Sequence, residues 1–230
     1  MEYPEDTKPR RHLEWTPDAT PPEGQRAALH RLANALRRTM VALMDTNASE
    51  EELNAAAEAA ERFAQRLEEG PRGRAQWGYA ESAIAGKHDA SFDNSPLLGE
   101  GNPIAPPIRT KIIGTGQIEA RALFPLTYEG PPGSVHGGFV AAAFDEVLGR
   151  VQSLTGNPGM TGTLIVRYRR PTPLYKEIVI RGRIDRIEGR KIFTTGELYD
   201  GDTLCAEAEA IFISVGRDRF QQMAAQREIP

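Results

Sequence analysis

The sequence predicts an α+β domain in which an antiparallel sheet packs against one long buried helix, with a helical hairpin in front of it. Apolar residues at three- and four-residue spacing precede residue 70, and alternating or β-branched runs fill the chain from Ile108 onward. One apolar helical stretch, Phe139 to Val151, separates two such runs from the four that follow it. This order of elements is typical of a sheet with its helix on one face.

Composition limits the classes of protein to consider. The 230 residues are 40% hydrophobic, enough for a sizeable core, and the net charge of −4 argues against a nucleic-acid binder. No apolar run approaches the ~20 residues of a membrane span, and no signal-peptide pattern is seen. The single cysteine, Cys205, excludes internal disulfides and favours a reducing compartment. We therefore expect a cytoplasmic protein.

The first third of the chain divides into an arm and a hairpin. Residues 1–22 are charged and proline-rich and are expected to form a mobile arm. Residues 23–69 should form two helices, the second beginning at the capping box Ser49–Glu52 and ending before Gly70-Pro71. Packing against the main domain or a partner subunit is the expected role of this hairpin, and a substrate lid is the alternative.

A linker and a sheet complete the predicted organisation. Residues 70–107 are rich in Gly, Pro, Ser and Asn and should wrap around the core, and residues 216–230 should form a C-terminal tail. The domain itself is expected at residues 108–215. Its strands are predicted at 108–114, 116–127, 161–170, 174–187, 190–200 and 203–215.

The loop that enters the central helix, EGPPGSVHGG, is the first candidate for chemistry. His136, Gly137 and Gly138 open the helix. Free backbone N–H groups and the positive end of the helix dipole make such a terminus a natural site for an anion or oxyanion. Glycines there let a ligand approach the backbone closely.

Asp145 is the second candidate, because it interrupts the apolar helix. Its neighbours three and four residues away offer it no partner on the same helix. A buried carboxylate costs several kcal/mol unless it is hydrogen-bonded or functional. The alternative is a narrow solvated stripe formed by an i,i+4 pair of Glu146 and Arg150, with Asp145 at its edge.

These residues together resemble the PaaI-like hotdog acyl-CoA thioesterases, closest to their "thioesterase superfamily member" branch. The resemblance rests on HGG, Asp145 seven residues after it, Thr161, and the blocks RYRRPTPL and EGRK in that order, within about residues 95–215. It implies the hotdog fold, in which the sheet wraps around a central helix. It also implies hydrolysis of an acyl-CoA thioester.

The resemblance and the chemistry suggest a role for each residue. Asp145 is expected to be the general base or the carboxylate nucleophile, and both remain open. The oxyanion donor is sought among His136, Gly137 and Gly138, with Gly138 as the main candidate. By resemblance Thr161 orients the acid and the water. Thr163 is the fallback, since it lies on the same face if its strand is regular.

Basic residues are the candidates for the phosphates of coenzyme A. Arg167 and Arg169 share one face of their strand, and Arg190 and Lys191 follow the turn at Glu188-Gly189. By resemblance these regions lie near the nucleotide, and Arg169 and then Lys191 are the preferred candidates. An ordinary solvated basic edge is the alternative for any single one of them.

A distance argument predicts the quaternary structure. Gly138 and Asp145 are seven residues apart, about 10 Å along one helix. A catalytic base must lie about 3 Å from the proton that it removes, directly or through a water. Each site should therefore combine Gly138 of one chain with Asp145 of another, which makes the protein a homodimer or a dimer of dimers.

Other chemistry is not indicated. The four histidines lack metal-ligand spacing, no G-x-S-x-G motif is present, and Gly114-Thr115-Gly116 lacks the context of a dinucleotide loop. We therefore expect no metal and no cofactor, and we expect Cys205 to be a buried core thiol. The predicted substrate is a medium-chain, long-chain or otherwise hydrophobic acyl-CoA. A silent hotdog that binds an acyl thioester or serves in assembly is the alternative, and a dehydratase would need an acid–histidine pair that we do not find.

Overall fold

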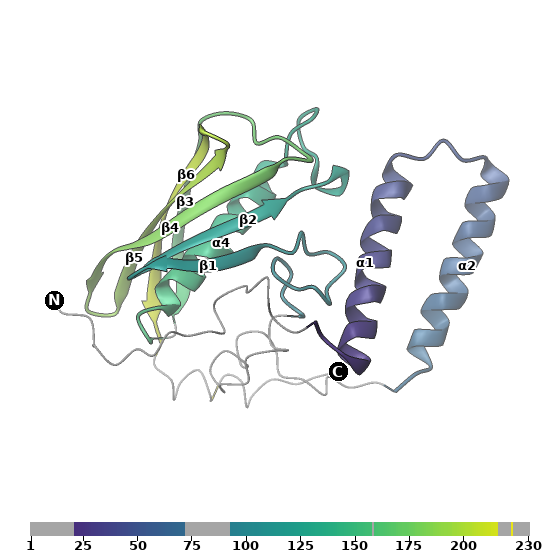
Figure 1. Ribbon diagram of the computed structural model, residues 1–230, viewed down its shortest axis with the longest axis horizontal. Coiled ribbons are helices and arrows are strands. Elements are labelled where there is room, and N and C mark those ends of the chain that lie inside the picture. The colour runs from purple at the N-terminus through teal and green to yellow at the C-terminus, as the bar shows by residue number, and fades with distance from the viewer. Residues whose placement is uncertain (1–20, 72–92, 158, 216–221, 223–230) are drawn as a thin grey trace.

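A six-stranded antiparallel sheet wraps around one central helix in the computed structural model, and a helical hairpin stands beside it (Figure 1). The structure describes residues 21–71, 93–157, 159–215 and 222. Residues 1–20 of the predicted mobile arm, most of the tail and residues 72–92 of the linker, including Trp77, Tyr79 and Phe92, lie outside the described residues. The predicted α+β hotdog arrangement with its hairpin is confirmed.

The elements follow one another closely along the chain. The helices and strands are α1 (Gly24–Met44), α2 (Glu50–Glu68), β1 (Arg109–Gly114), β2 (Gln117–Leu123), the 3₁₀ helix η2 (Leu126–Tyr128), α4 (Gly137–Ser153), β3 (Gly159–Tyr168), β4 (Glu177–Glu188), β5 (Lys191–Asp200) and β6 (Thr203–Ser214). The strands lie in the order β1-β2-β4-β5-β6-β3, so β1 and β3 form the two edges of the sheet. The second predicted strand ends earlier than expected, at Leu123, because η2 takes up the residues after Pro125.

Small residues on the sheet allow α4 to lie close to it. Gly182 and Gly196 pair across β4 and β5, and a Cβ at Gly182 would stand 2.8 Å from Val151 of the helix. Apolar side chains of α4, among them Phe144 and Leu148, fill the space above this pair and are fully buried. Cys205 is also buried, at 1% exposure, as predicted, and burial raises the pKa of its thiol.

α4 is buried on most sides, as predicted, but one side remains partly open in the single chain. Asp145 and Glu146 are half-buried, because β3 is an edge strand and no further strand lies beyond it. Arg150 is only 4% exposed. The alternative of a solvated Glu146–Arg150 stripe is therefore wrong, since its cationic end lies in the interior.

The two helices of the hairpin differ in their contacts. α1 lies along η2 and the loop before β1, and its Ala33 is buried. α2 begins at the predicted capping box, in which Ser49 and Glu52 bond to each other's backbone N–H, but none of its residues is buried. Figure 1 shows α1 beside the domain and α2 on its far side. The predicted packing on the domain thus holds for α1 only.

Candidate active site

The loop before α4 is fixed by backbone hydrogen bonds at short range. Gly130 N–H donates to Ser134 O at 2.9 Å, and His136 N–H donates to Tyr128 O at 2.8 Å. A Cβ at Gly130 would stand 2.6 Å from the Cα of His136, so only glycine allows this close approach. The chain therefore enters the helix along a single path, and the position of His136 is set before the helix begins.

His136 caps α4, and this decides which N–H groups remain available. Its Nδ1 accepts from Gly138 N–H at 3.0 Å. Among the described residues, none accepts a hydrogen bond from Gly137 N–H. The main candidate donor from the sequence, Gly138, is thus already engaged by its own N-cap, whereas Gly137 presents a free N–H at the positive end of the helix.

Tyr168 adds a contact that sequence reasoning missed. Its hydroxyl, from the end of β3, donates to Gly137 O at 2.8 Å, and its ring lies 3.4 Å from where a Cβ of Gly137 would stand. This bond fixes the orientation of the first peptide groups of α4. A tyrosine that ends a strand is common, so no sequence signal would have singled it out.

Asp145 and Thr161 are brought together as a pair. The Thr161 hydroxyl, from β3, donates to Asp145 Oδ1 at 2.7 Å. The partner that α4 could not provide comes from the edge strand beside it. One carboxylate oxygen is therefore engaged by the hydroxyl, while the half-buried carboxylate remains accessible from the open side of α4.

A bulge in β3 decides which threonine meets the helix. Thr161 lies opposite Phe212 and Thr163 lies opposite Ile211, so Gly162 is an extra residue between them. Phe212 is buried against α4, which places Thr161 on the helix side of the sheet. The fallback residue, Thr163, turns to the outer face. The premise of a regular strand was wrong.

The structure does not bring the predicted cations to this pair. Arg167 and Arg169 lie on the outer face of the sheet and pair with Glu209 and Glu207, each at 2.6 Å. Arg190 donates to Ser214 O at 3.0 Å. Lys191 lies opposite Ile213, which on its other side lies opposite Met160, the residue before Thr161. The β4–β5 turn and Thr161 are therefore at the same end of the sheet.

Other kinds of site find no support in the part of the chain that the structure describes. No group of three or more His, Cys, Asp or Glu residues is placed to hold a metal ion there. No helix among the described residues is long and apolar enough to cross a membrane.

Comparison with known proteins identifies the family of this chain. A family model described as the thioesterase superfamily matches residues 132–207. The crystal structure of the thioesterase superfamily protein RHA08564 is similar at a TM-score of 0.74 and 32% sequence identity, over 85% of this chain and 94% of that chain. The chain belongs to the thioesterase superfamily. The match to that structure extends beyond the sheet and α4, because residues 109–214 are less than half of the chain.

Curated relatives of this thioesterase superfamily member share its central region. The acyl-coenzyme A thioesterase THEM4 of Xenopus laevis is 38% identical over 89 residues, which are 38% of this chain and 40% of the relative. THEM4 of Bos taurus is 38% identical over 93 residues, which are 40% of this chain and 38% of the relative. The chain thus matches about two fifths of the length of these relatives. The region of the family model, residues 132–207, contains α4 and β3 but not the helical hairpin.

Proposed function

We propose that this protein hydrolyses acyl-CoA thioesters to the free acid and coenzyme A. The observation that carries the proposal is the hydrogen bond between Asp145 of α4 and Thr161 of β3. The same helix presents the free N–H of Gly137 at its first residue. The names of the THEM4 relatives support coenzyme A as the thiol. A medium-chain, long-chain or otherwise hydrophobic acyl group is the proposed substrate.

Asp145 supplies the base or the nucleophile. As a base it takes a proton from water, whose oxygen attacks the thioester carbon, and the tetrahedral intermediate then expels the coenzyme A thiolate. As a nucleophile it forms a mixed anhydride, which water hydrolyses in a second step. In both routes the Thr161 hydroxyl holds one carboxylate oxygen and leaves the other to react. A single turnover in H₂¹⁸O tests for the second route, because label enters Asp145 only when water opens an anhydride at its aspartyl carbon.

Gly137 N–H is the proposed donor to the oxyanion, in place of Gly138. It points out of the positive end of α4, and the bond from Tyr168 to Gly137 O keeps the neighbouring peptide groups in place. A donor that is fixed before the reaction begins stabilises the developing charge without reorganisation, the usual requirement of an oxyanion hole.

Two chains are proposed to complete each site. Gly137 and Asp145 are eight residues apart, about 12 Å along α4, so one chain cannot place both on one thioester carbon. The exposed edge strand β3 supports a partner, since it carries Met160, Ile165 and Tyr168 as exposed side chains. Pairing of β3 with its copy would continue the sheet and cover the open side of α4. The assembly is a dimer or a dimer of dimers.

Lys191 is the preferred contact for the phosphates of coenzyme A. It lies at the same end of the sheet as Thr161, and no described residue forms an ion pair with it. Arg190 lies next to it. Arg167 and Arg169 are less suited, because a phosphate would have to displace Glu209 and Glu207 from them.

The cytoplasmic location expected from the single cysteine stays a prediction.

The proposal is tested by thiol release from a panel of acyl-CoAs of increasing chain length. The Asp145→Asn variant keeps the shape of the side chain and removes its charge, so turnover is expected to fall by about 10²-fold or more. Saturable binding of acyl-CoA without turnover of any member of the panel would contradict the proposal and favour the silent binding protein.

Complementation tests the composite site. A bulky side chain at Gly137, as in Gly137→Val, should cover the free N–H and inactivate the enzyme. Mixing it with Asp145→Asn under subunit exchange gives hybrids in half of the dimers, each with one intact site, so activity should recover to about one quarter of the wild-type level. If exchange is confirmed and activity stays absent, each site lies within one chain.

A further inference from the structure

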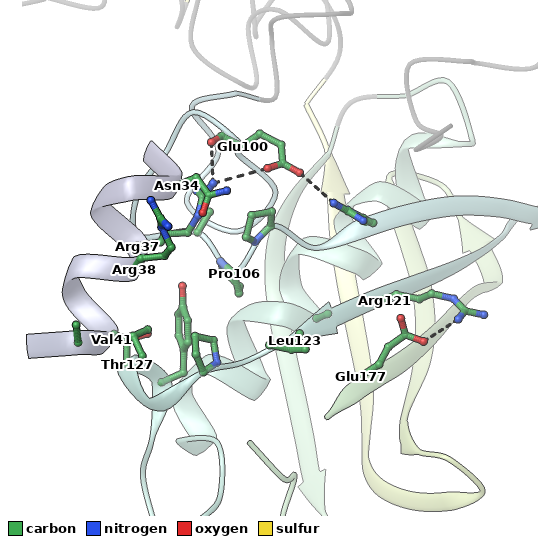
Figure 2. A pocket seen from close by; sticks show the side chains of 17 residues that line it. Asn34, Arg37, Arg38, Val41, Glu100, Pro106, Arg121, Leu123, Thr127 and Glu177 are labelled. Carbon is green, nitrogen blue, oxygen red and sulfur yellow. Dashed lines mark hydrogen bonds and ion pairs between the residues drawn. The ribbon is translucent and has the colours of Figure 1, made fainter. Parts of the chain in front are cut away.

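A cavity lies away from the candidate active site, between α1 and the β1–β2 corner of the sheet (Figure 2). Its volume is about 700 Å³, within the range of pockets that bind small molecules. None of Asp145, Thr161 or Gly137 lines it. Its apolar wall comes from both sides: Val41, Ala42, Pro106, Pro107, Leu123 and Pro125.

One face of α1 forms the outer wall of this cavity. The residues of α1 that line it, Asn34, Arg37, Arg38, Val41 and Ala42, follow one another at three- and four-residue spacing. Such residues lie on the same side of a helix. The wall therefore has two cations at one end and two apolar side chains one turn further along.

Hydrogen bonds fix the wall against the domain. Arg37 donates through Nη1 to Asn102 O at 2.8 Å and through Nη2 to Glu100 O at 3.0 Å. Opposite α1, the hydroxyl of Tyr128 donates to Ile104 O at 2.7 Å, and burial raises the pKa of this tyrosine to about 12. The cavity is thus built by bonds between segments far apart in the sequence, rather than left between loose ones.

The charges around the cavity favour an anion. In a chain of net charge −4, four arginines and only two glutamates line it: Arg37, Arg38, Arg109, Arg121, Glu100 and Glu177. Most of these are committed to one another, as Figure 2 shows for Arg121 and Glu177, whose side chains approach to 2.7 Å. Arg38 differs, since no described residue forms a hydrogen bond or ion pair with it. An incoming anion can bind Arg38 without displacing a partner.

The geometry points to a binding site for a fatty acid, with its carboxylate on Arg38 and its hydrocarbon chain along the apolar wall. The planar guanidinium matches a carboxylate through two parallel hydrogen bonds. Binding of the hydrocarbon chain is favourable because its apolar surface leaves water and contacts Val41, Pro106 and Leu123. This binding site is separate from the proposed thioester hydrolysis, and the inference does not depend on that activity.

Occupancy of this cavity has a direct route to the start of α4. Tyr128 lines the cavity, its backbone oxygen accepts from His136 N–H at 2.8 Å, and its ring packs edge-on against Phe139 with centroids 4.9 Å apart. A hydrocarbon chain bound in the cavity would therefore contact the residue whose backbone oxygen holds His136, the N-cap of α4.

Calorimetric titration of the full chain with dodecanoate, below the concentration at which it forms micelles, tests the site. Arg38→Met keeps the apolar stem and removes the charge, so the Kd for dodecanoate should rise about tenfold or more. Ala42→Trp fills the cavity from an exposed helix position and should abolish binding. Arg31→Met removes an exposed arginine of α1 outside the cavity and should leave Kd unchanged.

Ligand controls separate a fatty acid from related molecules. Dodecan-1-ol, with the same chain and no charge, should bind more weakly than dodecanoate, and coenzyme A without an acyl group should not displace dodecanoate. An unchanged Kd in Arg38→Met or in Ala42→Trp, with native circular dichroism in both, overturns the site, as does the absence of saturable binding. Displacement by coenzyme A assigns the cavity to phosphates and overturns it as well.

Discussion

At the scale of single residues, the candidate site depends on which side chains face α4. The sequence pattern offered two threonines two positions apart, and a regular strand would have made them equivalent. The bulge at Gly162 places Thr161 toward the helix and Thr163 toward the outer face. At the start of α4, the side chain of His136 accepts from Gly138 N–H, whereas no described residue accepts from Gly137 N–H. The first choice is made by a backbone bulge and the second by the contact of one side chain.

The two threonines provide a matched pair of variants. Thr161→Val removes the hydroxyl that donates to Asp145 and keeps the β-branched shape, so kcat should fall by about tenfold or more as the carboxylate loses its orientation. Thr163→Val makes the same chemical change on the outer face and should retain wild-type kcat. Steady-state thiol release from one acyl-CoA measures both. Equal loss in the two variants would mean that the bulge does not set the site.

At the scale of elements, the hairpin is two helices with different roles. α1 is attached to the loop before β1 by a partly buried ion pair: Asp93 accepts from Arg26 Nε at 2.7 Å and forms a hydrogen bond with His30 Nε2 at 2.8 Å. The side chain of Asp93 is only 4% exposed. α2 has no buried residue, and none of its residues lines the cavity whose outer wall is α1.

Breaking the ion pair at Asp93 should release α1 from the domain. Asp93→Ala removes the acceptor that Arg26 and His30 share and leaves their hydrogen-bonding groups unpaired, at a cost of about 1–3 kcal/mol. Hydrogen exchange should rise in α1 and in the loop at residues 93–105, while β4, β5 and β6 keep their protection. Glu58→Ala, which breaks an exposed i,i+4 pair on α2, is the control and should change neither region. Uniform loss of protection would show that the hairpin and the sheet unfold together.

At the scale of the whole molecule, the two edges of the sheet are unlike. β3 is an edge strand that carries exposed apolar side chains, whereas β1 lies on the side of the hairpin (Figure 1). The outer face of the sheet carries Arg–Glu pairs across neighbouring strands, such as Arg181 with Glu119, as expected of a face in contact with solvent. An edge strand with exposed apolar residues is a template for pairing, so β3 is the edge expected to meet a second chain.

Lysine substitutions distinguish the two edges. Ile165→Lys places a charge on β3, where Ile165 is 45% exposed, and should yield monomers with little activity, because lysine opposes edge-to-edge pairing. Ile113→Lys makes the same change on β1, where Ile113 is 48% exposed, and should keep the native assembly. Light scattering at micromolar concentration, followed by thiol release, checks both. A monomeric wild type with full activity would refute the composite site.

The sequence by itself determined the elements and the residue types of the site. Alternation, helical spacing and turn residues act over a few neighbours, so the strands, α4 and the capping box at Ser49 were placed nearly where they lie. The HGG motif and Asp145 identified the family. Within the described residues, the tertiary structure decided the bulge that selects Thr161, the capping of Gly138, the contact of Tyr168 and the arginine-lined cavity. Each of these depends on side chains that meet across different elements, and no local pattern encodes such distances.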